Sequence, residues 1–368
     1  SQVMMVCKMI ELFFKKFLLI YDVNYHLSIL GLLHCSFMKI LHVLLTRMPI
    51  PPTKYGGTER VLWALYQGQT ALGHEVKFLT KHDNKHPDAL VFNPNISLEK
   101  QVEGWADIIH FHFLYRGEIT TPFVCTTHNQ QITPASFPKN TIFLGKLHAQ
   151  RSGGQAYVHN GLYWADYGQP NLNTPKNYVH FLANAKYKDK NLKDSVTIAR
   201  QAGRPLHVIG SKRYSLKYKA GKYQPYYYQG ADLTFYGMLG GDKKNEVIKN
   251  SSALLFPVLN YEAFGLAMIE SLYLGCPVIG SRCGSLPELI IPEVGISTQS
   301  KSEMVEAIKN IAIFNRKHCH EYAQDNFNHL VMSQNYLHYY DKVLNGESLH
   351  DQEPSVTQNL PTQFHLVA

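Results

Sequence analysis

The chain has 368 residues, which exceeds what one hydrophobic core usually supports, so two domains of ordinary size are expected. Hydrophobic residues make up 45% and charged residues 17%, a composition typical of a soluble globular protein. The net charge of +8 favours anionic ligands or surfaces, but it does not choose among nucleotide-sugars, anionic lipids and nucleic acids.

The first 37 residues differ from the rest of the chain. Two apolar runs, Phe17–Tyr21 and Leu27–Leu33, are separated by polar residues, and neither approaches the roughly 18 apolar residues of a membrane span. No small-residue cleavage site of a secretory signal follows them. We expect residues 1–37 to be an extension outside the fold, with a membrane-surface anchor built on residues 13–17 as the alternative.

Six cysteines are spread without a CxxC motif or any metal-ligand spacing. They are Cys7, Cys35, Cys125, Cys276, Cys283 and Cys319. This pattern is typical of reduced thiols, so we expect a cytoplasmic protein.

From Met38 onward, strand-like apolar runs alternate with helical patterns, which predicts α/β domains with parallel sheets. Strands are expected at residues 40–45, 75–80, 108–113, 123–127, 178–182, 206–209, 233–236, 253–256 and 277–280. Helices are expected at residues 57–72, 191–202, 241–251, 265–274 and 302–314. We predict two doubly wound, Rossmann-like domains, residues 38–170 and 176–328, joined near residues 164–176 by a loop rich in Gly, Pro and Asn. Ligands of such sheets bind beyond the carboxyl ends of the strands, so the active site should lie in the cleft between the domains.

A glycine-rich loop, Pro51–Arg60, follows the first strand and opens a helix. It lacks both the P-loop Lys-Ser/Thr pair and the GxGxxG spacing, so nucleoside triphosphatase and dinucleotide-binding functions are disfavoured. Further along the chain, His110, His112 and His128 stand at the ends of two predicted strands. An imidazole there can hydrogen-bond a ligand hydroxyl or phosphate, whereas a metal site has no helical HExxH motif or cysteine partner to support it.

The tract Arg213–Tyr228 is rich in Tyr and Lys. Such residues can stack on nucleic-acid bases, but we favour a solvated insertion beside the cleft and expect no nucleic-acid partner.

The stretch Tyr261–Glu288 is the most informative part of the sequence and predicts a loop, a helix and a buried strand. Glu262 and Glu270 are separated by seven residues, and Gly265 lies where the helix begins. A helix N-terminus binds phosphate through its free N–H groups, and the two carboxylates can accept hydrogen bonds from hydroxyls on either side of that phosphate. The stretch therefore indicates an anionic ligand that carries hydroxyls.

This stretch resembles the signature of the retaining, GT-B fold glycosyltransferases of family 4, the glycosyl transferases group 1. The matching residues are Glu262, Gly265, Glu270, Gly275, Pro277, Val278, Ile279, Gly284, Pro287 and Glu288. The resemblance implies a nucleotide-sugar co-substrate, retention of anomeric configuration and a final helix, residues 329–345, that crosses back to the first domain. The remaining residues, 346–368, have the composition of a disordered tail.

The resemblance also implies roles for particular residues. His128 and Glu262 orient the reacting sugar and are the predicted catalytic residues, with His112 a weaker candidate. The predicted donor-binding residues are Gly56, Gly57, Lys190, Gly210, Gly237, Phe264, Gly265, Leu266 and Glu270. Among them, Glu270 would bind the ribose and Lys190 the diphosphate. No Asp-x-Asp motif is suitably placed, so we expect neither a metal nor another cofactor.

One position departs from the family pattern. Asn184 stands where many relatives have an arginine that grips the donor diphosphate, and a lysine does not reproduce the bidentate geometry of arginine. Two alternatives to a transferase therefore remain, a related nucleotide-sugar epimerase and a weakened sugar-nucleotide-binding protein. The acceptor is not identified by the sequence; the candidates are a glycan, a lipid-linked molecule and a small molecule, and a role in cell-envelope glycan biosynthesis is expected. Peripheral contact with an anionic membrane, at the inner membrane face, is an option.

Overall fold

The computed structural model describes residues 37–54, 56–212, 228–360 and 364–367. Residues 38–368 form one compact unit, which contains both domains. The predicted extension, apart from Phe37, lies outside the described residues, and so does residue range 213–227 of the Tyr- and Lys-rich tract. Among the helices that the structure describes, none combines the length and the apolar character needed to cross a membrane.

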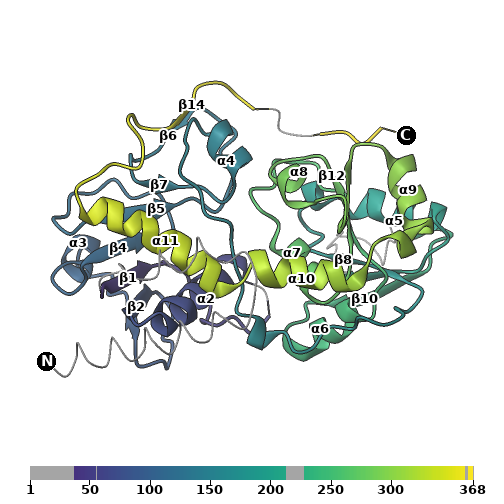
Figure 1. Cartoon of the computed structure of the whole chain (residues 1–368), viewed down its shortest axis with the longest axis horizontal. Coiled ribbons are helices and arrows are strands. Elements are labelled where there is room, and N and C mark those ends of the chain that lie inside the picture. The colour runs from purple at the N-terminus through teal and green to yellow at the C-terminus, as the bar shows by residue number, and fades with distance from the viewer. Residues whose placement is uncertain (1–36, 55, 213–227, 361–363, 368) are drawn as a thin grey trace, which may run out of the picture. The chain divides into compact units, whose positions relative to one another are not determined.

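The first domain is built on a six-stranded parallel sheet of order β3-β2-β1-β4-β5-β7 (Figure 1). Its strands are β1 (Lys39–Val43), β2 (Glu75–Thr80), β3 (Ala89–Val91), β4 (Ile108–Phe111), β5 (Phe123–Thr126) and β7 (Thr141–Ile142). The central strand β4 is buried along its whole length, as expected for a sheet that is covered on both faces. Ile40 and Phe78 pack in one core cluster and Leu41 and Leu79 in another, so side chains alternate between the two faces.

The second domain repeats this arrangement, with a parallel sheet of order β10-β9-β8-β11-β12-β13. Its strands are β8 (Val179–Leu182), β9 (Leu206–Ile209), β10 (Leu233–Gly237), β11 (Leu254–Phe256), β12 (Val278–Ser281) and β13 (Gly295–Thr298). The two strand orders are equivalent, and in both the order reverses beside the first strand of the domain. This reversal creates the crevice in which ligands of doubly wound sheets bind.

Helices connect the strands of both domains. They are α2 (Gly57–Ala71), α3 (Leu98–Val102), α4 (Lys146–Arg151), α5 (Leu192–Gln201), α6 (Gly241–Lys249), α7 (Leu266–Tyr273), α8 (Leu286–Leu289), α9 (Lys301–Lys309), α10 (Arg316–Asn326) and α11 (His329–Leu344). Short 3-10 turns are η2 (Trp164–Asp166), η3 (Lys188–Lys190) and η5 (Ile311–Ile313). The predicted α/β class with two doubly wound domains is confirmed.

Helix α11 returns to the first domain, as predicted, and packs against α2 (Figure 1). The contact is close because Gly68 of α2 has no side chain: a Cβ there would lie 2.5 Å from the carbonyl oxygen of His329. Tyr336 and Tyr340 of α11 are fully buried in the first domain's core. The returning helix is therefore an integral part of that core.

Two segments are more ordered than their composition suggests. In the expected linker, Trp164 is buried and stacks on Tyr273 of α7, with ring centroids 4.2 Å apart. In the expected disordered tail, β14 (Ser355–Val356) pairs antiparallel with β6 (Ala135–Ser136), and Val367 forms a bridge with Ser300. Composition alone does not reveal these contacts because each partner lies far away in sequence.

Candidate active site

A cavity of about 430 Å³ is lined by residues of both domains. It brings together ten of the eleven predicted site residues: Gly56, Gly57, His128, Lys190, Gly210, Glu262, Phe264, Gly265, Leu266 and Glu270. Gly237 is the exception. It ends β10, where its carbonyl accepts from the N–H of Gly210 at 2.7 Å, so it supports the cavity wall from behind.

The glycine-rich loop approaches the second domain at the cavity. Gly56 has φ +143°, and a Cβ there would lie 2.8 Å from Cβ of Pro52, so a larger residue would be strained and crowded. A Cβ on Gly57 would lie 3.3 Å from the side chain of Leu266 on α7. The buried Glu59 accepts a hydrogen bond from Thr46 Oγ1 at 2.6 Å and fixes the first turn of α2. The backbone of Gly57 therefore comes close to the start of α7 at this part of the cavity.

Helix α7 presents an uncapped N-terminus to the cavity. Gly265, its N-cap residue, has φ +94° in the left-handed region, and no side chain caps the helix. Phe264, Leu266 and Ala267 line the cavity around this end. Free N–H groups and the positive end of the helix dipole therefore face the cavity, which suits an anion such as a phosphate.

Lys190 and Glu262 form an ion pair at the cavity wall, in which Lys190 Nζ donates to Glu262 Oε2. Lys190 ends the 3-10 turn η3, and the following Asn191 adopts a left-handed conformation and caps α5 by accepting from the N–H of Asp194. Both side chains of the pair are partly exposed. The pair therefore offers one positive and one negative group to a ligand.

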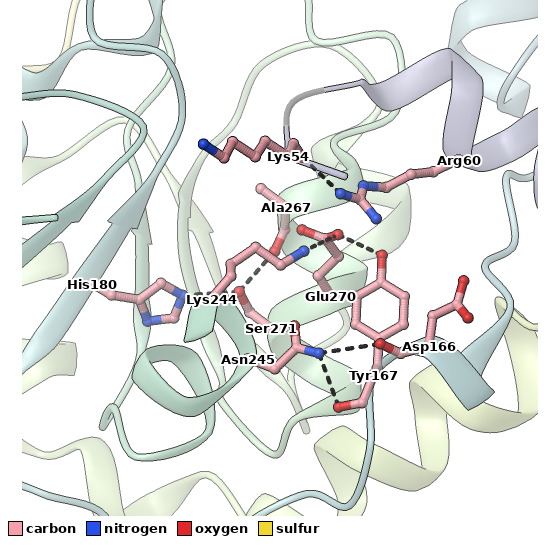
Figure 2. A network of polar contacts seen from close by, with 10 residues as sticks. All are labelled: Lys54, Arg60, Asp166, Tyr167, His180, Lys244, Asn245, Ala267, Glu270 and Ser271. Carbon is pink, nitrogen blue, oxygen red and sulfur yellow. Dashed lines mark hydrogen bonds and ion pairs between the residues drawn. The ribbon is translucent and has the colours of Figure 1, made fainter. Parts of the chain in front are cut away.

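Glu270 belongs to a buried polar network (Figure 2). Its Oε1 atom accepts from Lys244 Nζ at 2.6 Å and from Tyr167 OH at 2.5 Å, and Lys244 Nζ lies 4.9 Å from the centre of the Tyr167 ring. Burial would raise the pKa of Glu270, but the charges of Lys244 and Arg60 and the hydrogen bonds from Lys244 and Tyr167 lower it. Glu270 is thus a carboxylate held in a fixed orientation, and among the described residues its Oε2 atom has no hydrogen-bond partner.

Further residues surround this network (Figure 2). Asn245, next to Lys244 on α6, donates to the carbonyl oxygens of Asp166 and Tyr167 at 3.3 and 3.1 Å. Arg60 of α2 lines the cavity, and its Nη2 donates to the carbonyl of Lys54 at 2.7 Å. The hydrogen bonds therefore join the linker turn η2, α6 and α7 around one carboxylate, whose pKa the nearby charge of Arg60 also lowers.

Asn184, which replaces the arginine of the resembled family, lines the cavity. Its Oδ1 accepts from the N–H of Lys186 at 3.1 Å, so the side chain closes a local turn. The cationic side chains that line the cavity within the described residues are instead Lys54, Arg60, Lys190 and Lys244.

A second, polar cavity of about 360 Å³ adjoins the first. Residues shared by the two cavities include His128, Tyr187, Lys190 and Glu262. The second cavity is also lined by Gln130, Asp189, Asn260, Tyr261 and Ala263, which the first does not include. His128 and Glu262 therefore stand at the junction of two binding spaces.

A cluster of three histidines lies behind the cavities in the first domain's core. The ligand atoms of His42, His110 and His112 lie within 4.8 Å of one another, the spacing of a potential metal site. All six ring nitrogens, however, already take part in hydrogen bonds with Gln69, Tyr340, Thr126, His128 or each other. The three histidines therefore form a complete hydrogen-bond network, in which no ring nitrogen is left over to bind a metal.

Arg60, Asn160 and Lys244 line the first cavity and Tyr167 binds Glu270 beside it, although the sequence did not predict them as site residues. Asn160 is 2% exposed, and its Oδ1 has no hydrogen-bond partner in the described structure, so a buried acceptor lies unsatisfied in a residue that lines the cavity. The sequence predicts an Asn-Gly turn here and gives no further signal. Lys244 could have been found from its place in the first turns of the helix that follows β10, since such helices border the crevice.

Comparisons with known proteins bear on the family of the second domain and on the fold. Residues 164–327 match the family model for glycosyl transferases group 1. The second domain is similar to that family. A comparison with curated protein sequences gives no match.

Solved structures of glycosyltransferases share the fold over both domains. AviGT4, a glycosyltransferase involved in avilamycin A biosynthesis, is 19% identical with a TM-score of 0.70, over 84% of this chain and 98% of AviGT4. Sucrose-phosphate synthase from Thermosynechococcus elongatus is 17% identical with a TM-score of 0.62, over 84% and 100%. HepE from Anabaena, in complex with UDP and glucose, is 14% identical with a TM-score of 0.61, over 83% and 100%. The architecture is therefore GT-B, as predicted.

Proposed function

We propose that this protein is a glycosyltransferase that moves a sugar from a nucleotide-sugar donor to a hydroxyl of an acceptor, with retention of anomeric configuration. The observation that carries the proposal is the first cavity, where an uncapped helix N-terminus, a lysine and two carboxylates face one space. The match of residues 164–327 to glycosyl transferases group 1 supports it. So does the likeness in fold to HepE, which has been crystallised with UDP-glucose.

The donor diphosphate would lie at the N-terminus of α7, opposite Gly56 and Gly57. Lys190 would add a positive charge at the same place. As the glycosidic bond breaks, negative charge grows on the leaving diphosphate, and fixed N–H dipoles and an ammonium group stabilise that charge without reorganising. In this scheme the reaction needs no metal ion.

Donor binding would change the partners of the ion pair. In the ligand-free protein Lys190 neutralises Glu262. A diphosphate competes for Lys190, and Glu262 then becomes available to accept hydrogen bonds from sugar hydroxyls. Glu270 needs no such exchange, because Lys244 and Tyr167 both bind Oε1 and leave Oε2 for the ribose hydroxyls.

The second cavity favours transfer over epimerisation, because a transferase needs space for a second substrate beside the sugar. Its amides, Asn129, Gln130 and Asn260, and the carboxylate of Asp189 suit a hydroxyl-rich acceptor. His128 and Glu262 would orient the sugar at the junction, with attack on the face that the diphosphate leaves. We also propose, from the reduced-thiol pattern, that the reaction takes place in the cytoplasm, possible acceptors being a glycan, a lipid-linked glycan or a small molecule.

The test is calorimetry with a panel of UDP-, GDP- and ADP-sugars, followed by mass spectrometry of products formed from the best donor in cell extract. We expect one donor to bind and to yield a glycosylated product, with turnover unchanged by EDTA. Glu246→Ala, an exposed carboxylate on α6 outside both cavities, should leave turnover unchanged as a control. Binding without product would contradict a transferase, and conversion of the donor into another sugar nucleotide without acceptor would indicate an epimerase.

A further inference from the structure

Four polar side chains, three of them buried, form a continuous series of hydrogen bonds that ends at the partly buried His128. Gln69 Oε1 lies 2.8 Å from His42 Nε2, His42 Nδ1 lies 3.1 Å from His112 Nε2, and His112 Nδ1 lies 3.0 Å from His128 Nε2. We call Gln69, His42, His112 and His128 the histidine row. It begins on α2, crosses the ends of β1 and β4, and reaches the two cavities just beyond β5.

The histidines of the row are uncharged at neutral pH. Burial lowers the pKa of His42 and of His128 to about 4. Burial, together with the neighbouring histidines, lowers the pKa of His112 well below its ordinary value. A neutral imidazole has one N–H donor and one bare nitrogen acceptor, so each ring in the row donates one hydrogen bond and accepts another.

The direction of the row follows from its first member. The amide oxygen of Gln69 can only accept, so the proton of His42 is on Nε2 and its Nδ1 is bare. His112 must then donate from Nε2, and its bare Nδ1 must accept from Nε2–H of His128. The remaining nitrogen, Nδ1 of His128, therefore carries no proton.

A second set of hydrogen bonds begins at the other end of the Gln69 amide. Its Nε2 donates to Tyr340 OH at 3.4 Å, and Tyr340 OH lies 2.7 Å from His110 Nδ1. His110 Nε2 lies 2.8 Å from Thr126 Oγ1, which lies 3.1 Å from Tyr336 OH. The amide oxygen of Gln69 thus faces His42 and its nitrogen faces Tyr340, and this orientation sets the direction of the row.

We propose that the histidine row fixes His128 in its Nε2–H form, so that His128 offers a bare Nδ1 to the cavities as a hydrogen-bond acceptor for a ligand hydroxyl. His128 lines both cavities, and within the described residues its Nδ1 has no hydrogen-bond partner and is not among the buried atoms that lack one. Gln69, His42 and His112 are positioning residues that act through His128. The proposed function enters only in the nature of the hydroxyl, which belongs to a sugar or an acceptor.

Nuclear magnetic resonance of the whole ligand-free chain, labelled with ¹⁵N in its histidines, tests the row directly. The nitrogen shifts distinguish protonated from bare ring nitrogens, and His42→Gln, His112→Gln and His128→Gln assign the signals. We expect His42, His112 and His128 in the Nε2–H form at pH 7.5. His128 with its proton on Nδ1 would overturn the proposal, and because no ligand is used, this result is independent of whether the chain transfers sugars.

Two variants of Gln69 test whether the row, rather than the local surroundings of His128, sets the tautomer. Gln69→Leu removes the acceptor, so His128 should shift to a mixture of the two tautomers, whereas Gln69→Glu keeps the acceptor and should retain the Nε2–H form. Ser271→Ala, which removes the partner of the buried His180 in the second domain at 3.0 Å, should leave His128 unchanged. An unchanged His128 in folded Gln69→Leu would contradict the proposal.

Titration with zinc sulfate tests the alternative that His42, His110 and His112 form a metal site. We expect the signals of His42, His110 and His112 to be unaffected by one equivalent of zinc, because their nitrogens are engaged in hydrogen bonds. Stoichiometric binding that removes the N–H signals of these three rings would overturn the row in favour of a metal centre.

Discussion

Lys244 Nζ lies 2.6 Å from Glu270 Oε1, and this buried ion pair joins helix α6 to helix α7 at the wall of the first cavity. Their side chains are only 5% and 8% exposed. Two charges so far from water need good geometry to be tolerated, and Tyr167 completes that geometry from the linker between the domains. The pair therefore couples the stability of the second domain to the shape of the site.

Lys244→Ala should destabilise the protein by about 3–5 kcal/mol, because it leaves the Glu270 carboxylate buried without its counter-ion. The measurement is urea denaturation of wild type and variant at pH 7.5. Lys249→Ala on the same helix removes a more exposed pair with Glu246 and should cost less than about 1 kcal/mol. Equal losses in the two variants would mean that the buried pair contributes no more than a surface pair.

The double variant Lys244→Met/Glu270→Leu separates stability from binding. Well-packed apolar replacements of a buried ion pair are often neutral, so its stability should lie within about 2 kcal/mol of wild type. Its affinity for the best nucleotide-sugar should still fall by about 1.5–3 kcal/mol, since the ribose loses a charged acceptor. Calorimetry checks this, and wild-type affinity in the double variant would remove Glu270 from the donor site.

Lys190→Ala should lower kcat more than it raises KM, because the contact strengthens as charge develops on the leaving diphosphate. Asn184→Arg should keep or raise activity by restoring the guanidinium of the resembled family. Lys188→Ala, an exposed lysine in the same 3-10 turn, serves as the matched control and should change neither constant. Steady-state kinetics with the best donor measure both constants. If Lys190→Ala left kcat and KM unchanged, the diphosphate would have to bind elsewhere.

Stability should fall on acidification from pH 7 to pH 5. Burial lowers the pKa of His42 to about 4 in the folded protein, whereas in the unfolded chain it is near 6.5. Between these values the unfolded state binds more protons, so stability that is present above pH 6.5 is lost as the pH falls toward 4. His42 alone accounts for about 2 kcal/mol between pH 7 and pH 5.

Urea denaturation at both pH values measures this loss. In His42→Gln the difference between pH 7 and pH 5 should shrink by about that amount, while His318→Gln, at an exposed position on α10, should leave it unchanged. A wild type equally stable at both pH values would contradict the burial of neutral histidines.

Asn160→Leu should have opposite effects on stability and on binding. The buried Oδ1 atom lacks a partner among the described residues, so its removal should keep stability within about 1 kcal/mol of wild type or raise it, while ligand binding should weaken by about 1 kcal/mol. Ser333→Ala removes another buried oxygen without a partner, on α11 outside both cavities, and should leave binding unchanged. Unaltered affinity in Asn160→Leu would restrict Asn160 to a structural role.

Much of the fold could be predicted from the sequence, because the spacing of apolar residues distinguishes strands from helices over most of the chain. Strands β2 and β9 have the predicted bounds, and α11 crosses back as expected. The two-residue strand β7 is too short to give a pattern, and α10 is polar on most of its surface, with only Arg316, Cys319 and Ala323 buried.

The site could be predicted where a motif lies within one short stretch, as in Glu262 to Glu270. It could not be predicted where the partners come from distant segments. Tyr167 meets Glu270 across 103 positions and lies in a stretch whose composition predicts only a loop. His42 appears as a single histidine in an apolar strand, and its hydrogen-bond partners are 27 and 70 positions away. The roles of His128, Glu262 and the donor-binding residues stay predictions, because position beside a cavity does not measure their contribution.

The hydrogen bond between His110 and Tyr340 spans 230 positions, and this distance has a consequence for synthesis on the ribosome. Domains generally fold as they emerge, amino-terminal domain first. Here His110 is left without Tyr340, and Thr126 without Tyr336, until α11 leaves the exit tunnel. The first domain therefore completes its core only after the second domain has been made, and a nascent chain arrested before residue 329 should carry a loosely packed first domain.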